Sequence, residues 1–309
     1  MKIVYMGTGE FAVPPLKALM EAGHEILCAV CPEDKPNSRG NKIIPCAVKI
    51  FAEESGIEVY QPHRASSDES FGYLSAKGAD ILIVCSYGQI LRKNILTMCP
   101  YGALNIHSSL LPRYRGAAPM QRAVMNGESR TGVTVMYMDE GMDTGDIMYA
   151  SGIDISPEDT FGTVSGKLSE AGASLIVSAL EHLQAGDAPR IKQDVAEATY
   201  ADKITKEETK IDFGRDAETV ANTIRGLDPD PGARSVFAGK TVKLYAAVSV
   251  GDVTSGSPGE IIGKKDNGII VRCGENAVLI KKVKPEGKNL MGAIDFYNGI
   301  RDRKGAAFS

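Results

Sequence analysis

Short apolar runs recur along the first third of the chain, and most are separated by segments long enough to hold a helix. The expected strands are residues 2–6, 25–31, 80–86 and 102–108, and the expected helices between them are residues 14–22 and 43–55. Strands that alternate with helices at this spacing favour a mostly parallel sheet with helices on both faces. The sequence therefore predicts an α/β fold for its N-terminal part.

The rest of the chain changes character towards its end. Residues 131–138 and 146–155 alternate like strands, and residues 159–184 have the apolar spacing of a long amphipathic helix. From residue 187 the sequence becomes more polar. The last part contains short β-type runs separated by Gly, Pro, Asp and Asn, at residues 241–248, 259–262, 268–272 and 277–283. This pattern suggests a small barrel. We expect one domain over residues 1–189, a connector over 190–206 and a second domain over 207–309.

Length and composition indicate an ordinary globular protein. The 309 residues are many for a single domain, and 43% of them are hydrophobic and 24% charged. No apolar run approaches the roughly 20 residues that span a bilayer. No basic segment precedes the first expected strand, so neither a signal nor a transit peptide is visible. We expect a cytoplasmic protein that does not bind membranes.

The six cysteines do not indicate disulfides or a metal site. Cys28 and Cys31 have the spacing of a redox motif, but they lie in an expected strand, where positions three apart face opposite sides. We expect buried, reduced cysteines. No His or Cys cluster has the spacing of zinc ligands, so the sequence predicts no metal.

Charge is divided unevenly along the chain. Residues 240–309 hold 12 Lys and Arg against 7 Asp and Glu, whereas residues 1–239 hold 23 against 32. Such an excess could serve only solubility. Lys281, Lys282 and Lys284 nevertheless lie close together in the expected barrel, which makes contact with a phosphate backbone plausible.

Asn105 and His107 point to chemistry at the end of a strand. Residues two apart on a strand face the same side, so both side chains would project into one site. An amide donor beside an imidazole suits a carbonyl whose oxygen becomes negative during attack. Asp143, from a Gly- and Asp-rich turn, could orient the imidazole and raise its proton affinity. The run from Leu110 to Pro119 has no helical or strand period and is typical of a binding loop.

A competing pattern lies at the N-terminus. Gly7-Thr8-Gly9-Glu10-Phe11-Ala12 follows a strand and precedes a helix, which fits the dinucleotide-binding fingerprint of a nicotinamide-dependent oxidoreductase. Pro14 and Pro15 crowd the start of that helix, and an oxidoreductase would leave Asn105 and His107 unexplained. We therefore expect no NAD.

The motifs together resemble a known family. Asn105-x-His107, Ser109-Leu110-Leu111-Pro112 with the Arg-x-Arg-Gly-Ala-Ala-Pro that follows, and Gly141-Met142-Asp143-Thr144-Gly145 are similar to the motifs of the formyltransferases that use 10-formyltetrahydrofolate. Within that family, the chain resembles the members that formylate methionyl initiator tRNA. The resemblance covers nearly the whole chain and implies a Rossmann-like catalytic domain followed by a β-barrel similar to an OB fold.

The resemblance also implies a reaction and a folate site. The formyl group of 10-formyltetrahydrofolate would pass to the α-amino group of methionyl initiator tRNA, with Asn105, His107 and Asp143 as catalytic residues. Relatives carry a similar glycine turn without binding NAD. The folate would contact Ser109, Leu110, Leu111, Pro112, Gln89, Ile90, Leu91 and Asp139.

The implied tRNA contacts come from both domains. Residues 34–42 form a long polar loop, and in tRNA-modifying members an insertion here carries basic residues to the acceptor end; a shorter loop would favour the relative that formylates glycinamide ribonucleotide. The candidate contacts are Arg39, Lys42, Arg113, Arg115, Lys206, Lys281, Lys282 and Lys284. Other acceptors, such as an amino sugar nucleotide, stay open. We expect a monomer.

Overall fold

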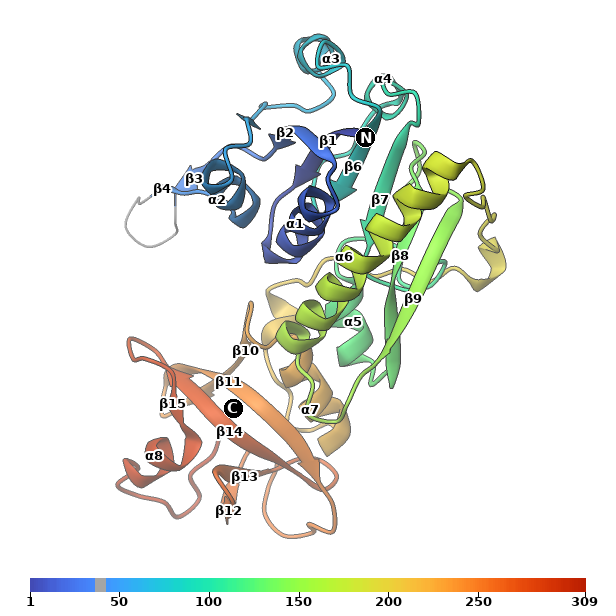
Figure 1. Cartoon of the computed structure of the whole chain (residues 1–309). Coiled ribbons are helices and arrows are strands. Elements are labelled where there is room, and N and C mark those ends of the chain that lie inside the picture. The colour runs from blue at the N-terminus through green and yellow to red at the C-terminus, as the bar shows by residue number, and fades with distance from the viewer. Residues whose placement is uncertain (37–42) are drawn as a thin grey trace. The chain divides into compact units, whose positions relative to one another are not determined.

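The computed structural model describes residues 1–36 and 43–309, and the chain folds into two compact units (Figure 1). The N-terminal unit comprises residues 1–117, 132–153 and 165–201, and the C-terminal unit comprises residues 118–131, 154–164 and 202–309. Residues 190–201, expected as a connector, thus belong to the N-terminal unit.

A mixed sheet forms the centre of the N-terminal unit. Within the described residues its strand order is β5-β2-β1-β6-β7-β8-β9. The strands are β1 (Lys2–Gly7), β2 (Glu25–Val30), β5 (Val59–Tyr60), β6 (Ile81–Cys85), β7 (Ala103–His107), β8 (Arg130–Tyr137) and β9 (Ile147–Asp154). The strands from β5 to β7 are parallel, and β8 runs antiparallel to β7. The chain leaves β1 towards β2 and returns on the other side at β6, and ligands bind α/β sheets at such a switch point.

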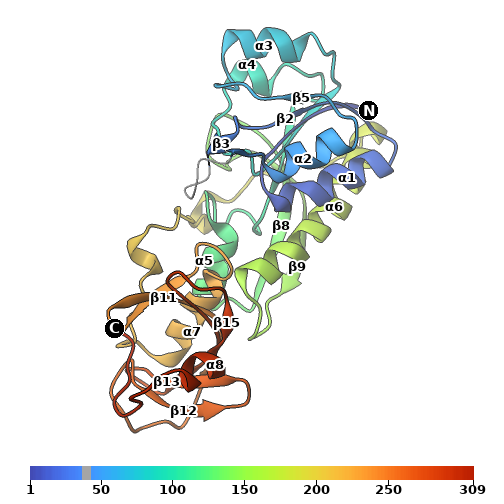
Figure 2. The same cartoon turned by 90° about the vertical axis from the view of Figure 1, so that its left-hand side faces the viewer.

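Helices and one small strand pair accompany this sheet. They are η1 (Glu10–Ala12), α1 (Val13–Glu21), α2 (Ala47–Glu54), α3 (Asp68–Ser75), α4 (Lys93–Leu96), α6 (Phe161–Ala185), η2 (Val195–Glu197), and the antiparallel pair β3 (Lys35–Pro36) and β4 (Ile43–Ile44). Figure 2 shows α1 and α2 side by side. Gly172 lets α6 approach β7 and β8 closely, because a Cβ there would lie 3.1 Å from Ile106 and 3.4 Å from Val133.

The C-terminal unit is built on an antiparallel sheet. Its strand order among the described residues is β10-β11-β14-β13-β12, with β15 paired to β14. The elements of this unit are α5 (Pro119–Met125), η3 (Glu207–Thr209), α7 (Ala217–Gly226), β10 (Ala233–Phe237), β11 (Lys240–Val250), β12 (Ile261–Lys265), β13 (Gly268–Arg272), β14 (Ala277–Pro285), β15 (Met291–Gly292) and α8 (Ala293–Asn298). Ile224 of α7 packs with Leu244, Ile269 and Ile280 of the sheet in one core.

The fold class predicted from the sequence is confirmed, with a Rossmann-like sheet followed by a domain of antiparallel strands. Closure of the second sheet into a barrel stays a prediction. The edge strand β10 and the residue before β12 each make an isolated bridge to the C-terminal segment, Phe237 with Phe308 and Glu260 with Ala307. Across the described residues, no helix is both long and apolar enough to cross a membrane.

Candidate active site

Asn105 and His107 occupy one face of β7, as the two-residue period of a strand requires. Ile106 lies on the opposite face, which α6 covers through Gly172, so the polar side chains face away from that helix. His107 is 6% exposed, whereas Asn105 is half-buried. The Asn105 amide has no hydrogen-bond partner among the described residues, so its N–H donors are open to a bound molecule.

Asp143 comes to His107 from the turn between β8 and β9. Its Oδ1 lies 3.6 Å from His107 Nδ1, and its Oδ2 accepts a hydrogen bond of 2.8 Å from the backbone N–H of Gly116. Asp143 has a φ of 55°, a conformation that costs free energy for a residue other than glycine. Gly145 is required two residues later, because a Cβ there would overlap the Tyr137 carbonyl at the end of β8.

The second ring nitrogen of His107 is already engaged. His107 Nε2 lies 3.0 Å from the Tyr114 carbonyl oxygen, and since a carbonyl only accepts, Nε2 carries a proton. The prediction that His107 donates directly to an oxyanion therefore needs Nδ1, the nitrogen that faces Asp143. A proton gained at Nδ1 would lie between the imidazole and the carboxylate.

The Ser109–Pro112 loop is tied to β8 by one threonine. Thr134 Oγ1 donates to the Ser109 carbonyl at 2.7 Å and accepts from the Leu111 N–H at 3.2 Å. The Ser109 hydroxyl donates to the Arg113 carbonyl at 2.6 Å, which closes the loop on itself. Because these bonds are local and specific, the loop has a fixed shape without being a helix or a strand.

A second segment, residues 193–201, holds the loop from outside, and we call it the strap. The Thr199 hydroxyl accepts from the Tyr114 N–H at 2.8 Å, and the Thr199 carbonyl accepts from the Arg115 N–H at 2.8 Å. The Ala201 N–H donates to the Arg115 carbonyl at 2.7 Å. Sequence reasoning missed the strap, since its residues lie in a polar stretch without period or motif.

Arg115, which was predicted to contact tRNA, is buried and paired inside the site. The side chain is only 3% exposed, and its Nε and Nη2 donate to Gln193 Oε1 at 3.1 and 2.7 Å. A guanidinium that is buried and paired in this way cannot reach a phosphate without leaving its place. Arg113, two residues earlier, is exposed.

The remaining predicted folate residues differ in how available they are. β6 and β7 are parallel neighbours, so the segments that follow them leave the same edge of the sheet. Ile90 is 89% exposed, whereas Leu91 is 4% exposed and belongs to the core. Gln89 Oε1 accepts from the Ala65 N–H at 3.0 Å. The exposed carboxylate of Asp139 accepts from the Gly141 N–H and the Thr144 hydroxyl, at 3.0 and 2.7 Å, and shapes its own turn.

The predicted lysine cluster on β14 divides between two faces. Lys281 Nζ lies 2.9 Å from Glu158 Oε1, on the same side of the strand as the buried Val283. Lys282 and Lys284 lie on the other side. The three lysines predicted to contact a phosphate backbone thus do not share one face of the strand, because alternate residues of a strand face opposite ways.

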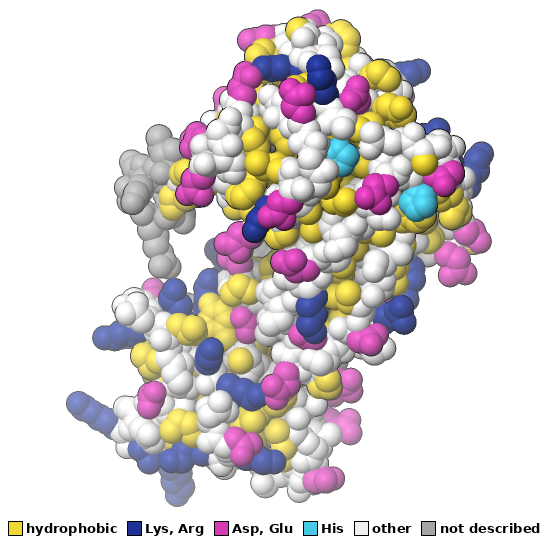
Figure 3. Space-filling view, viewed as in Figure 1, with side chains coloured by type: hydrophobic (Ala, Val, Ile, Leu, Met, Phe, Trp, Pro, Cys, Tyr) yellow, Lys and Arg dark blue, Asp and Glu magenta, His cyan; other side chains and the backbone are white. Residues whose placement is uncertain are grey.

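A different row of cations crosses this sheet, and we call it the cationic row. Arg234 on β10 is directly opposite Lys243 on β11, and Lys243 is directly opposite Lys284 on β14. Arg234 also donates to the Lys206 carbonyl at 2.6 Å, which places the backbone of that residue beside the row. Figure 3 shows many Lys and Arg side chains over the C-terminal unit. Arg39 and Lys42 lie outside the described residues.

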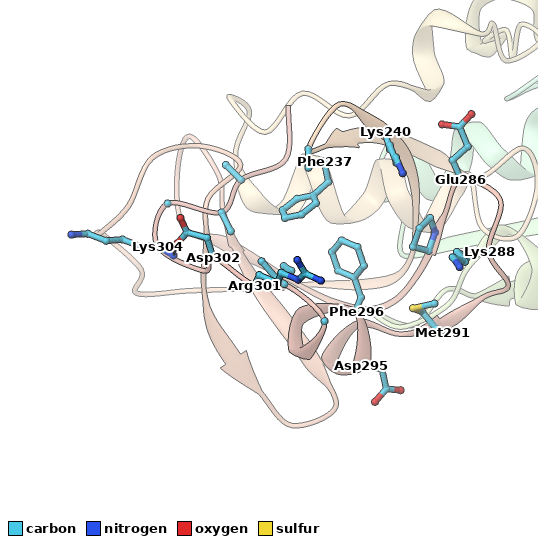
Figure 4. A pocket seen from close by; sticks show the side chains of 17 residues that line it. Phe237, Lys240, Glu286, Lys288, Met291, Asp295, Phe296, Arg301, Asp302 and Lys304 are labelled. Atoms are coloured by element: carbon cyan, nitrogen blue, oxygen red, sulfur yellow. Dashed lines mark hydrogen bonds between the residues drawn. The ribbon is translucent and has the colours of Figure 1, made fainter.

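A wide cavity of about 870 Å³ contains none of the predicted catalytic residues. It lies in the C-terminal unit, where the rings of Phe237 and Phe296 meet edge to face with centroids 5.2 Å apart (Figure 4). Lys240, Lys288 and Glu286 are among the charges around it. Its wide, mixed-charge opening gives no sign of a particular ligand.

The glycine turn that resembles a dinucleotide fingerprint has a packing reason of its own. A Cβ on Gly7 would lie 2.9 Å from the Tyr5 ring and 3.1 Å from both Ala12 and Val48. Gly7 thus allows the helices after β1 and β4 to pack closely. No group of three or more His, Cys, Asp or Glu side chains in the described part of the chain is arranged to hold a metal.

Comparisons with known proteins identify the family of the chain. The formyl transferase family model matches residues 1–180, and the model of the formyl transferase C-terminal domain matches residues 203–301. The methionyl-tRNA formyltransferase of Carboxydothermus hydrogenoformans is 44% identical, over 100% of this chain and 99% of that protein.

Two solved structures have the same fold at low identity. The methionyl-tRNA formyltransferase of Clostridium thermocellum has a TM-score of 0.54 and 17% identity, and the match covers 83% of this chain and 95% of that one. HypX of Aquifex aeolicus in complex with tetrahydrofolic acid has a TM-score of 0.66 and 19% identity, over 96% of this chain and 46% of that one. The full-length match at 44% identity, together with the two family models, shows that the chain belongs to the formyl transferase family and, within it, to the methionyl-tRNA formyltransferases.

Proposed function

We propose that this protein transfers the formyl group of 10-formyltetrahydrofolate to the α-amino group of methionine esterified to initiator tRNA. The observation that carries the proposal is the convergence of Asn105, His107 and Asp143 at the end of β7. The relatives' name supplies the acceptor, methionyl-tRNA, and the site supplies groups suited to this acyl transfer. The cytoplasmic location and the monomeric state stay predictions.

The first step is attack of the neutral amine on the formyl carbon. A new C–N bond forms and the formyl oxygen becomes an oxyanion. The unpartnered amide of Asn105 donates a hydrogen bond to that oxygen, and one such donor contributes about 2.7–4 kcal/mol to transition-state stabilisation. Because Asn105 is held on a strand, the donor is in position before the reaction begins.

The second task is to move one proton from the attacking amine to the departing folate nitrogen. His107 Nδ1 is the ring nitrogen not used by Tyr114, and it faces the Asp143 carboxylate. We assign this pair as the place where the proton is held between the two steps. The positive imidazolium formed in this way also stabilises the oxyanion nearby. The C–N bond to the folate breaks as its nitrogen receives the proton.

The folate is proposed to lie against the segments that follow β6 and β7. Ile90 offers an exposed apolar side chain, and the Ser109–Pro112 loop offers a backbone fixed by Thr134. An apolar wall beside a few fixed polar groups suits a flat ring system with hydrogen-bonding edges.

The tRNA is proposed to contact the cationic row together with Lys282 and Arg113. Like charges directly opposite one another in a sheet are destabilising. Among the described residues, Lys243 and Lys284 have no carboxylate partner. A phosphate backbone would relieve this repulsion, and contacts of Arg39, Lys42 and Lys206 with the tRNA stay predictions.

An acceptor panel tests the proposal. The purified protein would receive 10-formyltetrahydrofolate with Met-charged initiator tRNA, Met-charged elongator tRNA, glycinamide ribonucleotide, an amino sugar nucleotide, or water alone. We expect rapid formylation of the initiator tRNA only. Faster transfer to another acceptor, with no formylation of the initiator tRNA, would replace the proposed substrate.

A further inference from the structure

Gln193 joins the two segments that carry the site. Its Oε1 accepts both hydrogen bonds of Arg115, and its Nε2 donates to the carbonyl oxygens of Asp143 and Gly145 at 2.8 and 2.7 Å. All four hydrogen bonds fix which end of the amide is oxygen, since guanidinium only donates and carbonyls only accept. One half-buried side chain therefore connects the strap, the loop and the Asp143 turn.

Both the backbone and the side chain of Asp143 are held by hydrogen bonds. Gln193 holds the backbone carbonyl, while the Gly116 N–H holds one carboxylate oxygen at 2.8 Å. Gly116 directly follows Arg115, which bonds to Gln193. The hydrogen bonds to the Asp143 carboxylate and to the Asp143 backbone are therefore connected through these three residues. A φ of 55° at Asp143 persists only where its surroundings determine it, and these contacts do so.

The same strap also sets His107. Thr199 Oγ1 holds the Tyr114 N–H, and the Tyr114 carbonyl in turn receives the proton of His107 Nε2. His107 and Asp143, whose Nδ1 and Oδ1 lie 3.6 Å apart, are therefore both positioned by residues 193–201 and by the loop that these residues hold.

We propose that Gln193, with Arg115, is a positioning residue that sets the Asp143 carboxylate against His107 for proton transfer. The inference rests on the proposed function for its kinetic part. It assigns Arg115 a role inside the catalytic unit in place of tRNA contact. Gln193 bonds to the Arg115 guanidinium and to the backbone of Asp143 and Gly145, so it would act through Asp143.

Two substitutions remove the N–H donors of Gln193 but differ in the charge and polarity of the new side chain. Gln193→Glu keeps the shape and a partner for Arg115 but puts a negative oxygen against two carbonyls. Gln193→Met keeps the local charge but removes both polar ends. Lys192→Met is the matched control for Gln193→Glu, because it lowers the charge by one at the neighbouring, exposed position. The Tm of each variant is measured first.

We expect both Gln193 variants to lower kcat by about 10-fold or more, since catalytic groups displaced by ~1 Å lose up to about 10²-fold in rate. KM for folate and for tRNA should change less than threefold, and Gln193→Glu should keep its Tm within a few degrees. Lys192→Met should keep the wild-type kcat. A purely structural role would lower Tm and leave kcat of the folded fraction unchanged, and that result in the Glu variant would overturn the proposal.

A second readout does not depend on the acceptor. The protein has four histidines, so ring signals in a ¹⁵N-labelled sample can be assigned individually. Both Gln193 variants should shift the ring signals of His107 and leave those of His24, His63 and His182 in place. Unchanged His107 signals would refute the positioning role. If the acceptor panel fails while His107 still responds, the proposed substrate is wrong and the positioning role stands.

Discussion

The carboxylate of Asp143 stands 3.6 Å from the Nδ1 of His107, slightly beyond hydrogen-bond length, while its other oxygen is held at 2.8 Å by Gly116. The two side chains thus face each other without a hydrogen bond between them. Hydrogen bonds between catalytic groups are often long without substrate and tighten in the reactive complex. A proton arriving at Nδ1 would give the two groups opposite charges and draw them together.

Replacing Asn105 tests the oxyanion donor. Asn105→Ala should lower kcat by about 10²–10³ and leave the fold intact, because the amide has no partner to lose among the described residues. Steady-state formylation with circular dichroism as the fold control gives the answer. An Asn105→Ala protein that is folded and turns over at the wild-type rate would remove this residue from the mechanism.

The cationic row leads to a salt-dependence prediction. Lys243→Gln combined with Lys284→Gln should weaken tRNA binding and flatten the plot of log K against log salt, by about 0.9 for each phosphate that the protein no longer neutralises. Lys281→Gln is the control, because Glu158 already neutralises that lysine. Binding is measured across a salt series. If the control alone flattens the slope, the tRNA binds the other face of β14.

Cys46 should be the most reactive thiol of the chain. It receives a hydrogen bond from Cys31 and from backbone N–H groups at the start of α2, which together lower its pKa to about 6. The same hydrogen bond raises the pKa of Cys31, and burial raises the pKa of Cys28 to about 11. A lowered pKa means that the thiolate forms as pH rises through about 6.

The measurement is iodoacetamide labelling with peptide mapping between pH 5 and 9. Labelling at Cys46 should rise through pH 6, well before that of Cys28, and Cys46→Ser should abolish this early labelling. Uniform labelling of all six cysteines near pH 9 would show that the hydrogen bonds to Cys46 do not form in solution.

The Arg122–Glu208 pair predicts how the C-terminal unit responds to acid. The side-chain hydrogen bond from Arg122 is the main cause that lowers the pKa of Glu208 to about 2 from 4.5. A depressed carboxyl pKa stabilises the fold above the unfolded value and loses that contribution as pH falls towards the folded one. Since Glu208 is 35% exposed, we expect only about 1 kcal/mol.

Urea unfolding of wild type and Glu208→Gln checks this prediction. The advantage of wild type should be full above pH 4.5 and shrink as the pH is lowered to 3. Glu207→Gln, at an exposed position in the same short helix, is the matched control. If the stability difference between wild type and Glu208→Gln grew as the pH fell, the predicted direction of the pH dependence would be wrong.

Local sequence pattern was enough for the face of β7 and for the strands of the N-terminal sheet other than the short edge strand β5, which was not predicted. The apolar run at β6 and the two-residue period at β7 are properties of neighbouring residues, so the strands and the shared face of Asn105 and His107 could be predicted. The same period places Lys281 and Lys282 on opposite faces of β14. Helix α5 lies beside a loop that has no apolar period, and it was not predicted.

The contacts that complete the site join residues far apart in the chain. Gln193 meets Arg115 across 78 residues, and Asp143 meets Gly116 across 27. No spacing rule connects them, because each pairing depends on how distant segments of the chain come together in the fold. Arg115 is accordingly buried like a core residue, although its neighbours in the sequence are typical of an exposed loop.

The most direct test of the account is the single-turnover rate of formyl transfer to Met-charged initiator tRNA by wild type and by Asp143→Asn, with folate and tRNA both saturating. Asn keeps the shape of Asp143 and removes its charge. We predict that wild type forms formyl-methionyl-tRNA rapidly, and that Asp143→Asn binds both substrates but transfers at least about 10²-fold more slowly, as loss of an orienting carboxylate does elsewhere. Transfer by Asp143→Asn at the wild-type rate, or no product from wild type, would contradict the account.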